Sequence, residues 1–289
     1  MAFRNIIIQN RCKLEYSLNY LICKKGMEEK RVLLDEIKLI VITSTQVSIT
    51  TSLISMLSKN KIKIIFCDDT YNPECELVSY QNNYYSYRKI KEQIDFVKNQ
   101  GYLWKKIIIE KITNQARNLK KLNYLEQYQL LNNYCENVQD NDITNREGHS
   151  AKVYFNTIFG LDFNRKFNCL INKYLNYGYT VLLSTINREI KSLGYLTELG
   201  IHHIGESNQF NLSCDLIEPL RPLVDSYIIN NQVNDNNFKQ KFVEMLSIMV
   251  KYNNQSIYLD NAIHLYVSDL INFMKNKNEN KLSFIIYEL

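Results

Sequence analysis

The chain has 289 residues, of which 45% are hydrophobic and 22% are charged, and its formal net charge is +5 at pH 7. This composition excludes a disordered chain, because disordered chains lack the apolar residues that build a core. No apolar run approaches the ~18 residues that span a bilayer, and the start MAFRNIIIQN has too short an apolar segment for a signal peptide, so no membrane segment is expected.

Residues 1–80 are predicted to form a β-rich domain, because they contain short apolar runs separated by polar turns. One helix is predicted among the strands, at TTSLISMLSKN, where Leu53, Met56 and Leu57 have the i, i+3, i+4 spacing of a buried helix face. The candidate strands are NIIIQ, YLICK, RVLL, IKLIVI and KIKIIFC.

Helical spacing replaces this pattern further along the chain, for example at Ile90, Ile94 and Val97. Residues 81–87 are predicted to be the joint between domains, and residues 88–289 to be a larger all-helical domain. The final KLSFIIYEL fits either a strand or a helix end. The predicted fold class is α+β, with a small β-rich N-terminal domain followed by the larger helical one.

Charge is unevenly distributed along the predicted helices. Residues 85–121 hold ten Lys or Arg and three acids, whereas residues 122–163 hold two bases and six acids. A basic arm beside an acidic segment suits a bound polyanion next to a cation site, although a solvated helix face fits equally well. The seven cysteines show no C-x-x-C spacing, which favours a reducing, cytoplasmic location over a disulfide framework or zinc knuckle.

Glu147 has two possible roles. Thr144 and Glu147 match the S/T-x-x-E capping box, in which the glutamate only satisfies a helix N-terminus, and spacing alone favours that role. Arg146, Lys152 and Arg165 surround it with positive charge, as expected at a site that binds phosphate and metal together.

The segment Leu199 to Pro222 supplies a histidine and two further acids. His203 follows His202, and adjacent residues usually point to different sides, so at most one of them is expected to face a site. Asp215 and Glu218 are three apart, a spacing that places both carboxylates on one face of a helical turn, where a divalent cation would relieve their repulsion. A structural histidine and capping acids are the alternatives.

Several motifs occur in order within this helical region. They are R-E-G at 146–148, F-G-x-x-F-x-R at 159–165, N-x-x-L-N-Y-G-Y at 172–179, G-I-H-H at 200–203 and D-L-x-E-P-x-R-P at 215–222. Each is weak alone, but together they resemble the CRISPR adaptation integrase, the Cas-one family, over the whole chain. The segment NQFNLSCDLIEPLRP resembles most closely the type II branch of that family.

The resemblance implies a metal-dependent DNA integrase and endonuclease that joins the 3′-OH ends of captured double-stranded DNA to the leader-repeat by transesterification. By motif, Glu147, His203 and Glu218 hold Mg²⁺ or Mn²⁺, with Asp215 as a supporting acid. Carboxylate oxygens suit both ions. The expected contacts to DNA phosphates come from Lys105, Lys106, Arg146, Lys152, Arg165 and Arg221.

The family also implies partners. We expect a homodimer through residues 1–80, two such dimers bridged by a Cas-two dimer in a 4:2 complex, and contact with other type II adaptation and effector proteins. Two alternatives stay open at this stage. One is a general metal-dependent nuclease of branched or repair DNA, and the other is a non-catalytic scaffold.

Overall fold

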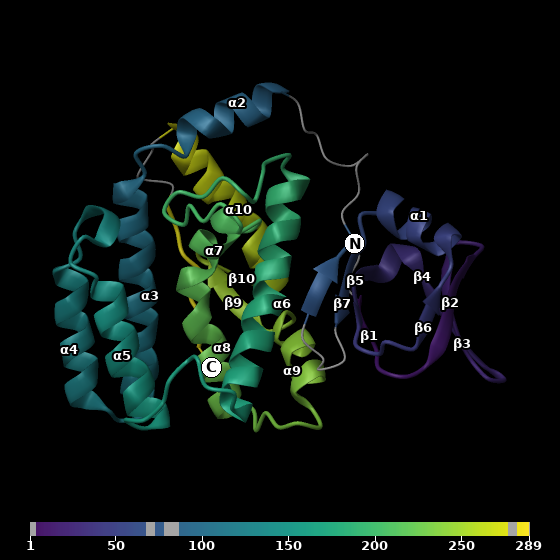
Figure 1. Cartoon of the computed structure of the whole chain (residues 1–289), viewed down its shortest axis with the longest axis horizontal. Coiled ribbons are helices and arrows are strands. Elements are labelled where there is room, and N and C mark those ends of the chain that lie inside the picture. Colours follow the sequence, from purple (N-terminus) through teal and green to yellow (C-terminus); the bar gives the residue numbers. More distant parts are fainter. Residues whose placement is uncertain (1–3, 68–72, 78–86, 277–281, 289) are drawn as a thin grey trace. The chain divides into compact units, whose positions relative to one another are not determined.

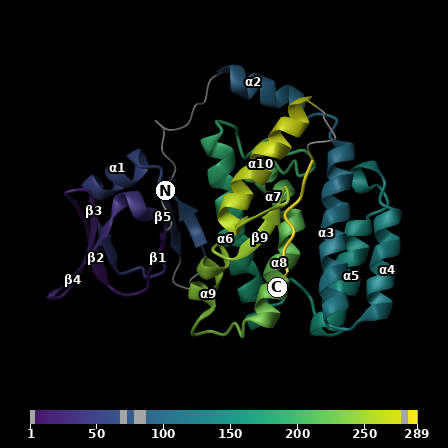
Figure 2. The same ribbon diagram turned by 180° about the vertical axis from the view of Figure 1, so that it is seen from behind.

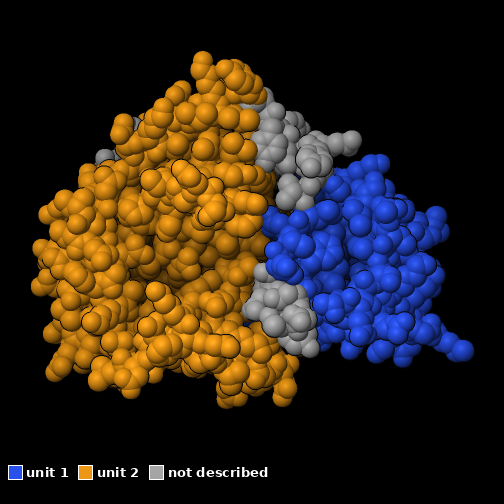
Figure 3. Space-filling model, in the orientation of Figure 1, with its two compact units in different colours: residues 1–84, 242–244 blue, residues 85–241, 245–289 orange. Residues whose placement is uncertain are grey.

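The computed structural model describes residues 4–67, 73–77, 87–276 and 282–288. It divides the chain into two compact units, residues 1–84 with 242–244 and residues 85–241 with 245–289 (Figure 3). Described strands concentrate in the first unit and helices in the second, which confirms the predicted α+β class. Of the predicted joint 81–87, only Tyr87 lies within the described residues.

Two four-stranded sheets form the first unit. One has the order β1-β5-β7-β8, with β5 parallel to both β1 and β7, and the other has the order β4-β3-β2-β6. The strands are β1 (Arg4–Ile8), β2 (Cys12–Ser17), β3 (Tyr20–Lys25), β4 (Glu28–Leu33), β5 (Ile37–Ile42), β6 (Val47–Ile49), β7 (Lys63–Cys67) and β8 (Pro73–Glu76). A short 3₁₀ turn, η1 (Leu34–Glu36), leads from β4 into β5.

The core of this unit lies around β5 and the predicted helix. Strand β5 is buried at all but one of its residues, as expected for a strand with neighbours on both edges and side chains covered on both faces. Helix α1 (Thr51–Lys59) buries Leu53 and Leu57, and the Thr50 hydroxyl caps it by accepting from the Leu53 amide at 3.3 Å. Strands β2, β6 and β8 were not anticipated, because their polar residues break the apolar runs.

Helices make up most of the second unit. In chain order they are α2 (Tyr87–Phe96), α3 (Gly101–Lys121), α4 (Leu125–Glu136), the 3₁₀ turn η2 (Asp140–Asp142), α5 (Arg146–Phe159), α6 (Leu170–Ser192), α7 (Asn211–Ile217), the 3₁₀ turn η3 (Glu218–Leu220), α8 (Arg221–Asn230), α9 (Phe238–Met245) and α10 (Leu259–Asn276). Among the described residues, none of these helices is both long and apolar enough to span a bilayer.

Helix α3 lies between two groups of helices. On one side it contacts α4 and α5, and on the other it contacts α7, η3 and α8. Figures 1 and 2 show the same arrangement from opposite sides, with α6 and α10 beyond α8. A helix covered on both sides needs a wide apolar surface, and α3 buries residues from Leu103 to Leu119 around most of its circumference.

A β-hairpin interrupts the helices, where the sequence predicted helix. Strands β9 (Met249–Tyr252) and β10 (Gln255–Tyr258) pair antiparallel. They are joined by Asn253 and Asn254, which have φ values of 49° and 63°. Two consecutive left-handed residues make the tight hairpin turn that asparagine tolerates, so the Asn-Asn pair was the available signal. The C-terminal segment 282–288 is extended and bridges to β9 through Ile286 and Lys251.

Candidate active site

A polar stripe on the buried side of α3 is the base of the candidate site. Lys111, Asn114 and Asn118 are spaced by three and four residues, so they lie on one face of the helix, and all three are buried. The Asn114 amide donates to the Pro219 carbonyl oxygen at 2.9 Å, and the Asn118 amide donates to the Pro222 carbonyl oxygen at 2.8 Å. These bonds fix the junction of η3 and α8 against α3.

Lys111 joins two of the predicted site acids. Its Nζ lies 2.6 Å from Glu147 Oε1 and 2.5 Å from Glu218 Oε2, although the two glutamates are far apart in the sequence. Burial alone would lower the pKa of the Lys111 ammonium, but the charges of Glu218 and Glu147 outweigh burial and raise that pKa above its ordinary value. Lys111 is therefore charged at neutral pH.

Glu218 has a second cationic partner in Arg221. The Arg221 Nε donates to Glu218 Oε1 at 2.8 Å, and the guanidinium lies 4.9 Å from the centroid of the Tyr179 ring. Burial would raise the pKa of Glu218, but Arg221 and Lys111 more than compensate and hold that pKa well below its usual range. Glu218 is thus a buried carboxylate that stays ionised because two cations face it.

The start of α5 shows that Glu147 is not a capping residue. Asn145 is the N-cap and accepts from the Gly148 amide at 3.2 Å, while the two Asp142 carboxylate oxygens accept from the Arg146 and Glu147 amides at 2.8 and 2.9 Å. Within the described part of the chain, the buried Thr144 hydroxyl has no hydrogen-bond partner. The capping box that the spacing favoured is therefore wrong, and the Glu147 side chain is free to reach Lys111.

Asp215 organises the histidine. Its fully buried carboxylate accepts from the backbone amides of Ile201, His202 and His203 at 2.6, 3.2 and 3.0 Å, and it lies 2.6 Å from His203 Nδ1. Both oxygens are thus used within the protein. With Nδ1 held by Asp215, the other ring nitrogen, Nε2, is left as the lone-pair donor, an arrangement common for histidines that bind metal.

Asp215 and Glu218, which the spacing places on one helical face, have different hydrogen-bond partners. Asp215 lies within α7 and bonds to the preceding loop, whereas Glu218 begins η3 and bonds to α3. Backbone amides and the His203 ring balance Asp215, whereas Lys111 and Arg221 balance Glu218.

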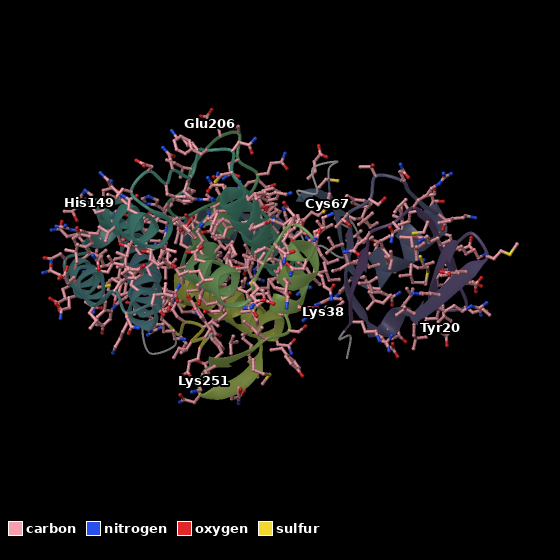
Figure 4. The ribbon with its side chains drawn as sticks, turned by 90° about the horizontal axis from the view of Figure 1, so that it is seen from below. Tyr20, Lys38, Cys67, His149, Glu206 and Lys251 are labelled. Carbon is pink, nitrogen blue, oxygen red and sulfur yellow. The ribbon has the colours of Figure 1, made fainter. Side chains whose placement is uncertain are left out.

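The loop between α6 and α7 brings both histidine rings against Trp104 with different ring orientations, so the two side chains do not point to opposite sides as expected. His202 stacks on the buried Trp104 ring, with centroids 4.0 Å apart and planes inclined by 5°, while His203 meets that ring edge-on at 5.8 Å. A Cβ at Gly200 would lie 2.2 Å from the His203 carbonyl oxygen, so only glycine allows this close turn. Figure 4 shows Glu206 at the outer edge of the loop.

These side chains suit a divalent cation without forming a finished site for one. Within the described ranges, no three His, Cys, Asp or Glu side chains are arranged as metal ligands, and the Lys111 ammonium bridges the two glutamates. The His203 ring is held at Nδ1 by Asp215, which chiefly, with smaller contributions from Glu218 and Glu147, raises the pKa of its imidazole. Two carboxylates and one imidazole nitrogen are a donor set that Mg²⁺ or Mn²⁺ accepts.

The predicted phosphate-binding residues occupy different environments. Lys152 is exposed, and Lys105 and Lys106 are half-buried, with the Lys106 ammonium 5.1 Å from the Tyr102 ring centroid. Arg165 donates to Asn172 and Asn176 at 2.5 and 2.7 Å. Arg146 lies over the Tyr134 ring at 5.5 Å, and Arg221 is bound to Glu218 as described. The structure therefore brings Arg221 alone among these residues into direct contact with a site acid.

Lys111 is the residue that the sequence analysis missed. It falls three and four residues after the buried Ile108 and Ile107, and one residue before the buried Ile112. A lysine in the apolar stripe of a helix needs an anionic partner, because an isolated buried charge is costly. The position of Lys111 within the apolar stripe was the signal for a buried, paired lysine. Counting all charges of residues 85–121 together did not distinguish it from the exposed lysines.

Comparisons with known proteins agree on one family. The sequence model described as "CRISPR associated protein Cas1" matches residues 6–256. The chain is 33% identical over 233 residues to the CRISPR-associated endonuclease Cas1 of Neisseria meningitidis serogroup C (strain 8013), covering 80% of this chain and 76% of the relative.

Solved structures share its fold. A casposase bound to integration product matches with a TM-score of 0.72 and 19% identity, over 96% of this chain and 92% of that one. A chain of a Cas6-RT-Cas1–Cas2 complex matches with a TM-score of 0.76 and 18% identity over 96% of this chain, which spans 36% of that longer chain.

Proposed function

The chain belongs to the Cas1 family of CRISPR-associated endonucleases and integrases, and from that premise we propose that it joins captured DNA to the CRISPR leader-repeat in a metal-dependent reaction. In this proposal the 3′-OH ends of a double-stranded DNA attack the phosphodiester at the repeat by transesterification. The observation that carries it is the convergence of Glu147 and Glu218, from α5 and η3, on one buried cation, Lys111, together with a His203 ring that Asp215 holds in the loop before α7.

Each side chain has a role that its contacts support. Glu147, Glu218 and His203 would hold Mg²⁺ or Mn²⁺, and Asp215, which holds Nδ1 of the imidazole, would leave Nε2 available to the ion. When bound, such an ion polarises a phosphodiester and stabilises the charge that develops on its oxygens. Arg221 lies beside Glu218, where its guanidinium can also contact a phosphate.

The proposal is tested by incubating the protein, with a Cas2 partner, with a labelled duplex and a plasmid that carries the leader-repeat. The expected result is joined product with Mg²⁺ or Mn²⁺ and none with a chelator. Cleavage of branched DNA without joining, and without a need for Cas2, would instead identify a general metal-dependent nuclease.

We further propose that the β-rich unit forms a homodimer contact and that two dimers assemble with a Cas2 dimer. A groove of about 300 Å³ in this unit is lined by apolar residues that include Ile6, Leu21 and Val32 and by polar residues that include Gln9 and Lys30. Strand β1 lies at the edge of its sheet, so its outer edge can pair with another chain. A second copy of this unit is the occupant that the proposal requires.

A dimer is therefore expected when the purified chain is measured by multi-angle light scattering at micromolar concentration. Its mass should fall toward that of one chain only on strong dilution, because the groove and strand edge would bury apolar surface in the dimer. A single-chain mass at every concentration would contradict this part of the proposal.

Reversal of Lys105 and Lys106 to glutamate is expected to weaken DNA binding at every DNA sequence. The reason is that such residues neutralise backbone phosphates. Each lost contact should reduce the magnitude of the slope of log affinity against log salt concentration by about 0.9. The measurement is a metal-free binding titration of one duplex at several salt concentrations. Lys251→Glu, an exposed lysine of β9, serves as the control and should leave the slope unchanged. An unchanged slope in the double variant would remove Lys105 and Lys106 from the DNA interface.

A further inference from the structure

Lys111 occupies the place between the two glutamates that a divalent cation would take. We propose that Lys111 is an internal counter-ion which must leave Glu147 and Glu218 before metal can bind, and that a DNA phosphate receives it, so that metal and DNA bind cooperatively. This inference rests on the proposed function, because it concerns the same three ligands. Lys111 is a positioning residue in this scheme, since it controls when the ligands become available.

The distances make the two cations mutually exclusive. One nitrogen contacts both carboxylates at 2.5 and 2.6 Å, so the oxygens already converge on a single point that Lys111 Nζ fills. An ion such as Mg²⁺ binds oxygen at about 2.0–2.1 Å and would require the same convergence without the ammonium. The side chain of Lys111 must therefore move when the ligands close around a metal.

The charges explain why the free protein keeps Lys111 in place. Glu147 and Glu218 together carry two negative charges, and Lys111 and Arg221 together carry two positive charges. Glu218 has only 4% of its side chain exposed and would be a costly isolated charge without these partners. Lys111 thus stabilises the ligands in the absence of metal, and the network is neutral.

The same balance predicts the role of DNA. Addition of a divalent cation to the neutral network leaves an excess of positive charge around Lys111, which opposes metal binding. A phosphate of bound DNA supplies negative charge where the ammonium is released, so DNA should increase the affinity for metal. By thermodynamic linkage, metal should increase the affinity for DNA by the same factor.

The experiment measures Mn²⁺ affinity of the full chain by calorimetry, with and without a saturating short duplex, using the duplex alone as a blank. A single charge within about 4–6 Å shifts the pKa of an ionisable group by about one to three units, so removal of the like charge that competes with the metal should have an effect of at least one such unit, and Lys111→Met is expected to bind Mn²⁺ at least about tenfold more tightly than wild type without DNA. The gain that DNA produces in the wild type should shrink in Lys111→Met.

Two variants control for charge and for nonspecific effects. Lys111→Arg keeps the cation and should retain the weak affinity of the wild type without DNA and the gain on DNA binding. Lys120→Met removes an exposed lysine from the same helix and should leave the Mn²⁺ affinity without DNA unchanged. Circular dichroism of each variant shows whether it folds.

Specific outcomes overturn the inference. It is wrong if Lys111→Met binds Mn²⁺ no more tightly than wild type, or if DNA raises the affinity equally in both. If Lys111→Met does not fold, the wild type alone decides, because a Mn²⁺ affinity that DNA leaves unchanged contradicts the coupling. In each case the wild type can still join DNA with Mn²⁺, and only absence of both joining and Mn²⁺ binding would also overturn the proposed function.

Discussion

Glu218→Gln is expected to reduce strand joining by orders of magnitude while DNA binding persists or tightens. The substitution keeps the shape and one of the two oxygens that accept from Lys111 and Arg221, but it removes the negative charge that a divalent cation needs. If that ion supplies several kcal/mol of transition-state stabilisation, its loss slows joining by about 10²–10⁴-fold. Loss of one carboxylate also lowers repulsion toward a polyanion, so binding without metal should not weaken.

The measurement pairs the plasmid joining assay with a metal-free binding titration on the same preparation. Glu126→Gln, which neutralises an exposed glutamate of α4, is the matched control and should join DNA at the wild-type rate. Joining by Glu218→Gln at that same rate would show that Glu218 is not a ligand. A parallel loss of DNA binding would point to a disturbed fold instead of lost chemistry.

The sequence predicted the fold class and the β-rich-then-helical order of the chain better than it predicted individual strands. The α+β class and the helix at α1 followed from apolar periodicity, which burial of Leu53 and Leu57 confirms. Strand β2 was missed because Lys13 and Glu15 interrupt its apolar residues. In the structure these two side chains form an ion pair, with Lys13 Nζ 2.9 Å from Glu15 Oε2. The β9–β10 hairpin was missed because an Asn-Asn turn carries no glycine or proline.

At the site, the sequence identified residue types but not their partners. The spacing of Thr144 and Glu147 fitted a capping box, yet Asp142 reaches the same amides after a turn through η2, which no local pattern specified. Asp215 and Glu218 fitted a shared cation, yet each carboxylate has protein partners of its own that spacing did not specify. Contacts such as Lys111 to Glu218 join positions 107 residues apart, and only the packing of α3 against η3 creates them.

Asp215→Ala is expected to be the most destabilising single change around the site. The carboxylate is fully buried and accepts three backbone amides of the loop that carries His203, together with the His203 ring. Its removal leaves those donors unsatisfied inside the protein, so the free energy of unfolding should fall by about 3–5 kcal/mol. Urea unfolding of the full chain in the presence of a chelator measures this loss without any contribution from metal.

Asp215 is also expected to affect metal affinity, through His203. This effect distinguishes it from a buried acid that only stabilises the fold. Without Asp215 the imidazole loses the partner that holds Nδ1 and leaves Nε2 available to metal, so Mn²⁺ affinity should fall by about 10–100-fold. His203→Ala should lose that affinity with a smaller loss of stability, because the loop amides keep Asp215. The exposed Asp235, bound to Lys173 at 3.0 Å, is the control, and Asp235→Ala should cost less than about 1 kcal/mol. If Asp215→Ala unfolds like the Asp235 control, the loop does not depend on this carboxylate, and the assignment of Asp215 as the residue that orients His203 is wrong.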